Sequence, residues 1–365
     1  MKICHFTSAH PRGDVRVFYK QCTYLAKNGH DVTLIVADGK GNEEKNGVKI
    51  IDIGNYRLNR FKRLTTAKKR IFQKAIEIQA DIYQFHDPEL LSVGKKLKKS
   101  GKKVVFDSHE DVPKQILYKT WLGPLRIRKI ISKQYNKYEK KAVKKLDGLI
   151  SVIDEITDKF ECKRKVTLKN YPILETYNKF INSYDRKKKQ FVYVGSLTHH
   201  RGIKDCIQAM RFISDEYRLV LIGGFASEEF KAQCEALPEW EKVVYKGFLP
   251  MEEVAPILGD SLVGLSVLHP EENYKMSLPT KGFEYMSAGT PIVLSDFDYW
   301  KPYFDGCGIF VQPESPKIIA EGMLEIIGNK SNYETIRKKC IDKAKTYSWE
   351  TEVQKLIQLY EDVLS

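Results

Sequence analysis

The residues best placed to do chemistry lie in the segment 277–294. A polar loop comes first, a short helix runs from Thr280 to about Ala288, and Gly289 follows as a left-handed cap before a buried strand. The start of such a helix offers unpaired amide N–H groups and the positive end of its dipole, which together bind anions. Lys281 adds a cation, whereas the Glu284 carboxylate suits vicinal hydroxyls such as those of a ribose. This pattern predicts a seat for a nucleoside diphosphate, and an ordinary amphipathic helix is the alternative. The residues of the predicted seat are Ser277, Leu278, Pro279, Thr280, Lys281 and Glu284.

A second anion-binding loop is expected where the chain begins a new strand-loop-helix unit. The strand 190–194 ends in a polar loop bounded by glycines, and a helix starts at Ile203. Arg201 in this loop can hold a diphosphate through two parallel hydrogen bonds. The neighbouring His199 and His200 have no further ligands at metal spacing, so we expect solvent-exposed histidines, no metal and no other cofactor.

Two histidine-acid pairs follow predicted strands in the first half of the chain. They are His86-Asp87 and His109-Glu110. Ligand-binding groups gather at the carboxyl ends of parallel strands, and imidazole is the side chain that changes charge near neutral pH. We expect His109 and Glu110 to be catalytic and His86 and Asp87 to lie on the acceptor or phosphate side. The alternative is that each histidine caps a helix or bonds a neighbouring backbone group.

The segment Pro279 to Met286, which reads Pro-Thr-Lys-Gly-Phe-Glu-Tyr-Met, resembles the donor-binding signature of the retaining GT-B glycosyltransferases of family 4, the group 1 glycosyltransferases. The resemblance implies that Glu284 holds the nucleotide ribose. The family signature has another glutamate, and Met276 stands in its place here. The contact of that glutamate with the donor sugar is therefore absent, or has moved to Glu271 or Glu272.

The resemblance also implies roles for residues elsewhere in the chain. Arg201 stands at a lysine of the family's phosphate loop and Ser196 at an arginine, which makes Lys281 the expected substitute cation. His109 matches a histidine beside the donor sugar. Three further sets are implied: Gly195 with Ser196 and Arg201 on the donor phosphates, Gly247 and Phe248 on the nucleobase, and Gly13, Asp14 and Arg16 near the donor phosphates and acceptor.

Length and pattern predict an α/β protein of two Rossmann-like domains, and the resemblance implies the GT-B fold, in which the two face each other across a cleft. A chain of 365 residues is too long for one core. Strand, helix and strand follow one another at 2–7, 15–28 and 31–37. We expect an N-terminal acceptor domain at 1–170, a linker at 171–189 and a donor domain at 190–349. The final helix, 350–365, is expected to pack back on the first domain.

The net charge of +14 comes from an excess of Lys and Arg in residues 1–170, and it is densest in a predicted helix at 124–145. Ile and Tyr follow one side of this helix, an arrangement that favours binding to an anionic membrane surface. A solvated surface and a nucleic-acid site are the alternatives, and no nucleic-acid motif accompanies the charge. With no apolar run of 18 residues, no leader and seven scattered cysteines, we expect a cytoplasmic protein, peripheral on the inner leaflet.

These features predict an enzyme that moves a sugar from a nucleotide-diphosphate sugar, UDP-linked before GDP-linked, to an acceptor hydroxyl with retention of configuration. The expected acceptor is a lipid-linked saccharide of surface-polysaccharide or glycolipid assembly. Two alternatives are kept. One is a nucleotide-sugar epimerase of the same fold, and the other is a non-catalytic protein that binds nucleotides or membrane surfaces.

Overall fold

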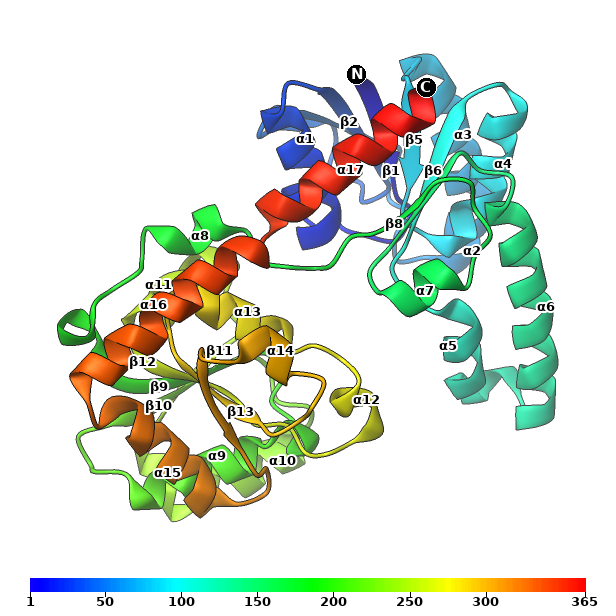
Figure 1. The fold of residues 1–365 in the computed structure, drawn as a ribbon. Helices are drawn as coiled ribbons and strands as arrows, with labels where there is room; N and C mark the ends of the chain where they lie inside the picture. Colours follow the sequence, from blue (N-terminus) through cyan, green and yellow to red (C-terminus); the bar gives the residue numbers. More distant parts are fainter. The chain divides into compact units, whose positions relative to one another are not determined.

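The computed structural model describes residues 1–365, apart from the side chain of Asn273. The chain divides into two compact units (Figure 1). Unit 1 is Met1–Asn170 together with Trp349–Ser365, and unit 2 is Tyr171–Ser348. Residues 171–189, expected as a linker, therefore belong to unit 2. Tyr171 and Tyr177 are buried in its core, because these large aromatic side chains remove more apolar surface from water there than in an exposed connection.

Unit 1 contains an eight-stranded sheet in the order β3-β4-β2-β1-β5-β6-β7-β8, in which β3 alone is antiparallel to its neighbour. The strand order reverses between β1 and β5, and Phe6 lies opposite Phe85 in that pair. Open α/β sheets bind ligands at such a reversal, outside the carboxyl ends of the strands. The strands are β1 (Lys2–Phe6), β2 (Asp31–Val36), β3 (Glu43–Lys45), β4 (Val48–Asp52), β5 (Ile82–Phe85), β6 (Lys103–Ser108), β7 (Gly148–Ser151) and β8 (Lys165–Thr167).

The helices of unit 1 form two groups. In one, α1 and α17 contact each other; in the other, α4 contacts both α3 and α6 (Figure 1). The first helical stretch begins at Asp14, whose carboxylate accepts the amide hydrogens of Arg16 and Val17. The helices are the π-helical η1 (Val15–Cys22) continuing as α1 (Thr23–Lys27), α2 (Arg60–Lys62), the π-helical η2 (Arg63–Ala67), α3 (Lys68–Ile78), α4 (Leu91–Lys99), α5 (Val112–Tyr118), α6 (Leu125–Val143), α7 (Asp154–Asp158) and α17 (Trp349–Leu364).

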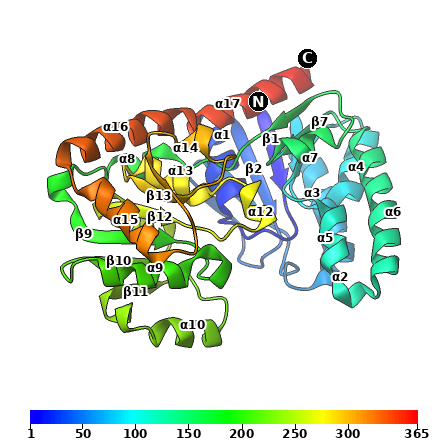
Figure 2. The same ribbon diagram turned by 60° about the horizontal axis from the view of Figure 1, so that its bottom comes forward.

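Helices α5 and α6 pack against each other and extend beyond the sheet as a pair (Figure 1), and Figure 2 shows the same pair from another direction. The 3-10 turn η4 (Thr120–Leu122) joins them. Trp121 and Ile130 are 63% and 58% exposed at this connection and at the start of α6. The sequence analysis expected α6 but not α5, because Val112–Tyr118 is short and starts with a Val-Pro pair.

Unit 2 contains a six-stranded parallel sheet in the order β11-β10-β9-β12-β13-β14. Successive residues of a strand enter opposite cores: Phe191 lies in one apolar cluster, and Val192 in the other. The strands are β9 (Lys188–Val194), β10 (Arg218–Ile222), β11 (Val243–Gly247), β12 (Ser261–Ser266), β13 (Ile292–Ser295) and β14 (Gly308–Val311). The helices are α8 (Leu174–Asn178), α9 (Ile203–Ala209), α10 (Glu228–Glu235), α11 (Met251–Asp260), α12 (Glu272–Lys275), α13 (Thr280–Ser287), α14 (Lys301–Phe304), α15 (Pro316–Ile327) and α16 (Lys330–Thr346).

Candidate functional site

The donor seat in unit 2 lies where its strand order reverses, between β9 and β12. The loop after β9 holds Gly195 and Arg201, and the loop after β12 leads into α13 with Lys281. Helix α13 is tied to this point by Tyr285, whose hydroxyl accepts the Val194 amide hydrogen at 3.1 Å and lies 3.2 Å from the Leu265 carbonyl. The start of α13 is therefore held beside the glycine loop.

Lys281 and Arg201 meet at Gly195. A Cβ atom on Gly195 would lie 3.3 Å from Arg201 Nη1 and 3.8 Å from Lys281 Nζ, and the backbone there has φ +121°. Lys281 Nζ also lies 3.7 Å from the centre of the Tyr193 ring. Only glycine leaves room for two cations to approach the backbone at this loop.

The Lys281 ammonium is buried without a matching anion. Its residue is 8% exposed, and Nζ has no hydrogen-bond partner among the described residues. Burial, and then the charge of Arg201, hold the pKa of Lys281 well below its usual 10.5. Burying a cation in this way is unfavourable in the free protein. An anionic group placed between Lys281 and Arg201 would offset that cost.

The other residues of the predicted seat surround the start of α13. The Ser277 carbonyl accepts the Trp300 indole N–H at 2.6 Å, which fixes the loop that includes Leu278. Pro279 precedes the helix without a side-chain cap, and Thr280 is its exposed first residue. Glu284 is half-buried one turn further on, close enough to act electrostatically on Lys281 and Tyr177.

The ends of β10 and β11 continue the same edge of the sheet. A Cβ atom on Gly223 would lie 2.0 Å from the Gly195 carbonyl oxygen, and the Gly223 amide donates to the Gly247 carbonyl at 2.7 Å. The adjacent Phe248 ring is 87% exposed. Ser196 is exposed, and its carbonyl accepts the Tyr193 hydroxyl at 3.1 Å. The structure thus brings the donor-side glycines together and leaves an aromatic face available for stacking at their margin.

In unit 1, a cavity of about 860 Å³ opens at the carboxyl ends of β1, β5 and β6. His86, Asp87, His109 and Glu110, the residues selected from the sequence, line it, and so does His10, which was not selected. The Glu110 carboxylate is exposed and accepts the Gln115 amide at 2.6 Å. His10 and His109 lie with their ring centres 5.0 Å apart.

Asp107 organises the floor of this cavity. Its Oδ2 lies 3.0 Å from His109 Nε2 and 3.2 Å from His86 Nδ1. Arg16 donates to both carboxylate oxygens, with Nη2 2.9 Å from Oδ1 and Nε 3.2 Å from Oδ2. Burial would raise the pKa of Asp107, but the charge of Arg16, and then that of His109, hold it well below its usual value. Asp107 is therefore an ionised hydrogen-bond acceptor.

The three residues of the first loop that were expected near the donor phosphates and acceptor do not line this cavity. Arg16 does not line the cavity, because its guanidinium is buried and bound to Asp107 and the Leu168 carbonyl. Asp14 acts as the helix cap described above and lies 3.3 Å from His10 Nδ1. Gly13 is exposed and lies outside the residues that line the cavity. Arg16 and Asp14 thus bind groups of the protein itself, at the floor and beside the mouth of the cavity.

Asp87 is a buried acceptor within the same floor. Its Oδ2 accepts the Thr7 hydroxyl at 2.7 Å and the Ser8 amide hydrogen at 2.6 Å. Its Oδ1 lies 3.5 Å from His10 Nε2. Burial lowers the pKa of His10, but the hydrogen bond that His10 donates to Asp14 and the charge of Asp87 outweigh it and raise that pKa above 6.5. The two carboxylates thus favour the protonated form of His10 at the cavity.

His86, Asp107 and His109 come near to the geometry of a metal site, since their ligand atoms lie within 4.8 Å of one another. The Asp107 oxygens, however, already accept hydrogen bonds from Arg16 and Gln21. A cation there would have to displace these donors and lie beside a guanidinium. The three residues fit a hydrogen-bonded cluster better than a metal centre.

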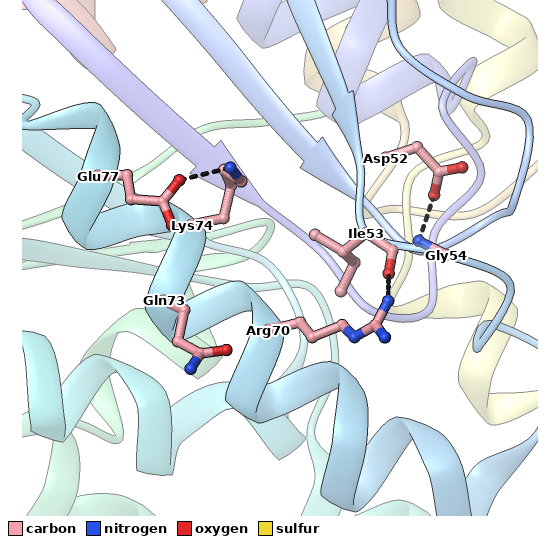
Figure 3. Close-up of a pocket in the computed structure, with 7 residues that line it drawn as sticks. All are labelled: Asp52, Ile53, Gly54, Arg70, Gln73, Lys74 and Glu77. Atoms are coloured by element: carbon pink, nitrogen blue, oxygen red, sulfur yellow. Dashed lines mark hydrogen bonds and ion pairs between the residues drawn. The ribbon is translucent and has the colours of Figure 1, made fainter.

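A smaller cavity of about 420 Å³ lies between β4 and α3 (Figure 3). Asp52, Arg70, Lys74 and Glu77, its charged groups, all have partners within the protein. Asp52 accepts the Gly54 amide hydrogen at 2.9 Å, and Arg70 donates to the Ile53 carbonyl at 3.0 Å. Lys74 is bonded to Glu77. This pocket lacks the unpaired charge that marks the donor seat.

Family models match both units of the chain. The model described as glycosyl transferases group 1 matches residues 175–347, and the model described as glycosyltransferase family 4 matches residues 11–167. The chain belongs to the group 1 glycosyltransferases of family 4. The family resemblance and the expectation of a glycosyltransferase enzyme are thereby confirmed.

Relatives of this family 4 protein agree with that assignment. An uncharacterized glycosyltransferase of Methanocaldococcus jannaschii is 28% identical over 183 residues, and the match spans 47% of this chain and 45% of that protein. The chain therefore matches less than half the length of this curated relative.

Solved structures show the GT-B fold that the resemblance implied. A glycosyltransferase of Rickettsia africae superposes with a TM-score of 0.72 at 13% identity, over 100% of this chain and 98% of that one. Sucrose-phosphate synthase of Thermosynechococcus elongatus gives 0.69 at 15% identity, over 99% and 98%. The HepE protein of Anabaena, solved with UDP-glucose, gives 0.67 at 13% identity, over 98% of each chain.

This family 4 glycosyltransferase departs from the signature at Met276, and the structure separates the two candidates for the moved contact. The Glu271 carboxylate lies 3.0 Å from His200 Nδ1, beside the loop that carries Arg201. Glu272 is bonded to Lys275 on the exposed side of α12. Glu271 is therefore the glutamate that lies near the donor loop.

Several residues of this family 4 site could not be selected from the sequence. Tyr193 is hidden within an apolar strand, and the position of Lys281 on its helix does not by itself indicate that the two side chains would meet. His10 lies in a loop that was selected for other residues. Arg60, Lys68, Lys119 and Trp121 line the unit 1 cavity but come from three separate segments with no shared motif.

Proposed function

We propose that this protein transfers a sugar from a UDP-sugar to an acceptor hydroxyl with retention of the anomeric configuration. The observation that carries the proposal is the pair of cations at Gly195: Lys281, buried without an anionic partner, and Arg201 beside it. A diphosphate is the ligand that suits a lysine, a guanidinium and a helix start together. The nucleotide is proposed as UDP because HepE was solved with UDP-glucose and a Burkholderia xenovorans neighbour is named UDP-forming.

Each donor-side residue has a place in this proposal. Lys281 and Arg201 stabilise the negative charge that grows on the diphosphate as its bond to the anomeric carbon breaks. Glu284 accepts hydrogen bonds from the ribose hydroxyls, Phe248 stacks on the base, and Glu271 contacts the sugar. The acceptor oxygen forms the new bond on the same face, and its proton leaves with the diphosphate. We propose no metal, because the two cations and the helix dipole supply the positive charge.

The proposed acceptor binds in the cavity of unit 1, next to His109 and Glu110. This cavity is also lined by cations that form no ion pair among the described residues, namely Arg60, Lys68 and Lys119. Arg60 lies over the Trp121 ring at 4.9 Å, and burial lowers the pKa of Lys68. Cations beside an aromatic platform suit a saccharide that carries a phosphate, such as a lipid-linked one.

The α5–α6 pair is the proposed contact with an anionic membrane on the cytoplasmic side. Tyr118, Trp121, Ile127 and Ile130 are exposed there among lysines and arginines. Aromatic and aliphatic side chains mixed with cations bind the headgroup layer. None of the helices in the described residues is long and apolar enough to span a bilayer. The binding we propose is therefore peripheral.

Thermal unfolding with UDP, GDP and ADP tests the donor assignment. A nucleotide present at 100 times its dissociation constant stabilises the protein by about 2.7 kcal/mol. UDP should therefore raise the unfolding temperature of unit 2, and GDP and ADP should raise it less. Release of UDP from UDP-sugars, with acceptor extracts added, then tests transfer. Interconversion of UDP-sugars without any acceptor would identify an epimerase instead, and binding without turnover would identify a non-catalytic protein.

A further inference from the structure

Six buried side chains of unit 1 form a closed ring of polar contacts. Starting from Asp107, the ring passes through Gln21, Gln84, Tyr360, His5 and His86 and returns to Asp107. The joining distances lie between 2.5 and 3.2 Å. Tyr360 belongs to α17, 355 residues away from its partner His5. Of the six side chains, only His86 lines the cavity. His109 is outside the ring and is hydrogen-bonded to Asp107.

The direction of each hydrogen bond follows from the charge of Asp107. Because this carboxylate is ionised by Arg16, it can only accept, so Gln21 must turn its amide nitrogen toward it. The Gln21 oxygen then accepts from the Gln84 amide. The Gln84 oxygen therefore accepts a hydrogen bond from the Tyr360 hydroxyl at 2.5 Å, which uses the single hydrogen of that hydroxyl.

The same logic fixes the protons on two histidines. Since the Tyr360 hydroxyl donates its hydrogen to Gln84, the Tyr360 oxygen must accept a hydrogen bond from His5 Nε2–H at 3.1 Å. Burial, and next the charge of His86, lower the pKa of His5 well below 6.5, so the ring is neutral and Nδ1 has no proton. His5 Nδ1 then accepts from His86 Nε2–H at 3.0 Å. The His86 proton is thereby held on the side away from Asp107.

This arrangement matters for His109. His86 Nδ1 and His109 Nε2 both lie near Asp107 Oδ2, and they are 3.4 Å from each other. If both nitrogens carried hydrogen, two N–H groups would compete for one oxygen and oppose each other. With the His86 proton on Nε2, the unprotonated His86 Nδ1 faces His109 Nε2–H and does not compete with it for Asp107 Oδ2, which also accepts from Gln21 and Arg16 Nε.

We propose that Tyr360 is a positioning residue for His109: through Gln84 and His5 it keeps the His86 proton on Nε2, so that no His86 N–H competes with His109 for Asp107 Oδ2. His109 is thereby held with Nε2 protonated and Nδ1 as its acceptor nitrogen. The catalytic relevance of this inference rests on the proposed function of His109, whereas the protonation pattern does not. The two are tested by separate measurements.

The protonation pattern is measured by NMR on the unmodified protein labelled with ¹⁵N-histidine. Protonated and unprotonated ring nitrogens differ in ¹⁵N shift and in coupling to the ring hydrogens, and His86 and His109 signals are assigned by their loss in His86→Gln and His109→Gln. We expect both residues to show a protonated Nε2 and an unprotonated Nδ1. A protonated Nδ1 on a neutral His86 would overturn the proposal without bearing on the sugar transfer.

The Tyr360→Phe variant keeps the aromatic side chain of residue 360 packed and removes only its hydroxyl. His5 Nε2–H then loses its acceptor, and the His86 proton should move to Nδ1, where it gains a charge-assisted bond to Asp107. We expect this move in the NMR spectrum, together with a fall of about 3- to 10-fold in kcat for UDP release from UDP-glucose and little change in KM.

Tyr83→Phe is the matched control, because Tyr83 is buried in the same unit and its hydroxyl accepts the Ala80 amide hydrogen at 2.8 Å outside the ring. It should leave the His86 signals and kcat unchanged. An unaltered His86 in Tyr360→Phe, or equal losses of kcat in the two variants, would overturn the positioning role. If no form of the protein releases UDP, the proposed function fails while the NMR result still decides the ring.

Discussion

The ammonium of Lys281 lies 3.7 Å from the centre of the Tyr193 ring. Lys281 Nζ has no hydrogen-bond partner among the described residues, and the charge of Glu284 acts on it without a hydrogen bond. A cation–π contact of this kind contributes about 0.5–2 kcal/mol, less than the hydration that the ammonium loses on burial. Lys281 is therefore retained at a cost to the stability of unit 2.

Replacing Lys281 by Met should separate stability from function. The thioether chain fills similar space over Tyr193 without a charge, so we expect the free energy of unfolding of unit 2 to rise by about 1 kcal/mol. UDP binding should weaken at least about 10-fold, because a charged hydrogen bond to phosphate is lost. Scanning calorimetry and titration calorimetry measure the two effects. Lys317→Met, an exposed lysine of α15, should change neither.

UDP binding should depend on pH through Lys281. Burial and Arg201 lower the pKa of this lysine in the free protein, and a bound diphosphate raises it, so binding takes up a proton in the pH window between the two values. The affinity for UDP should consequently fall as pH rises through that window, because the free lysine loses its proton before the bound one does. Calorimetry in two buffers of different ionisation enthalpy measures the proton uptake. The same uptake in Lys281→Met would assign it to another group.

Glu284 and Arg201 should affect different parts of the donor. Glu284→Gln removes a charged acceptor for the ribose and should weaken UDP binding about 10-fold while sparing inorganic diphosphate. Arg201→Ala should weaken both ligands, because its guanidinium lies at Gly195, where we propose that the phosphates bind. Competition binding with a fluorescent UDP analogue distinguishes the two patterns. Tight UDP binding by Glu284→Gln would exclude the ribose role.

Membrane binding should depend on the exposed cations of α6. Arg128 is not among them, since it is half-buried and donates to the Leu117 carbonyl, although the sequence placed it on the basic side. Charge reversal of the exposed cations of α6 should release the protein from phosphatidylglycerol vesicles at low salt, because each cation near the membrane surface contributes about 1 kcal/mol to binding. The set is Arg126, Lys129, Lys133 and Lys137, each changed to Glu.

The control for this experiment reverses four exposed lysines of unit 2, Lys317, Lys330, Lys338 and Lys345. It makes the same change in net charge away from α6. Cosedimentation of both variants with the vesicles measures the difference. Equal binding by the α6 variant and the parent protein would show that this helix is an ordinary solvated surface.

The sequence indicated those parts of the site that are local. Helix α13 and its cap could be predicted because the glycine, Gly289, follows the last apolar residue at the spacing that a left-handed end requires, and the structure has φ +61° there. The seat at Lys281 and Glu284 follows from their positions in the first turns of that helix. Parallel strands were recognisable as apolar runs because both faces of each sheet are covered.

The parts that could not be predicted depend on tertiary contacts. Arg16 looked available for phosphate because nothing near it in the sequence is acidic at the right spacing, yet Asp107, 91 residues later, binds it. Lys281 meets Tyr193 and His5 meets Tyr360 by the same kind of long-range packing. The strand β3 was missed because Glu43–Lys45 is short and wholly charged, so it has none of the apolar alternation that indicates a strand.

The last helix bears on the order in which the protein can form during synthesis. Unit 1 buries Trp349, Leu356 and Tyr360 of α17, and the Trp349 indole donates to the Lys20 carbonyl at 2.7 Å. When the ribosome has made residues 1–170, the unit therefore still lacks one wall of its core and one member of the ring of polar contacts. Unit 2 has all of its own residues earlier, once Ser348 has emerged. The unit that is translated first is completed last, and until then it leaves apolar surface open to chaperones.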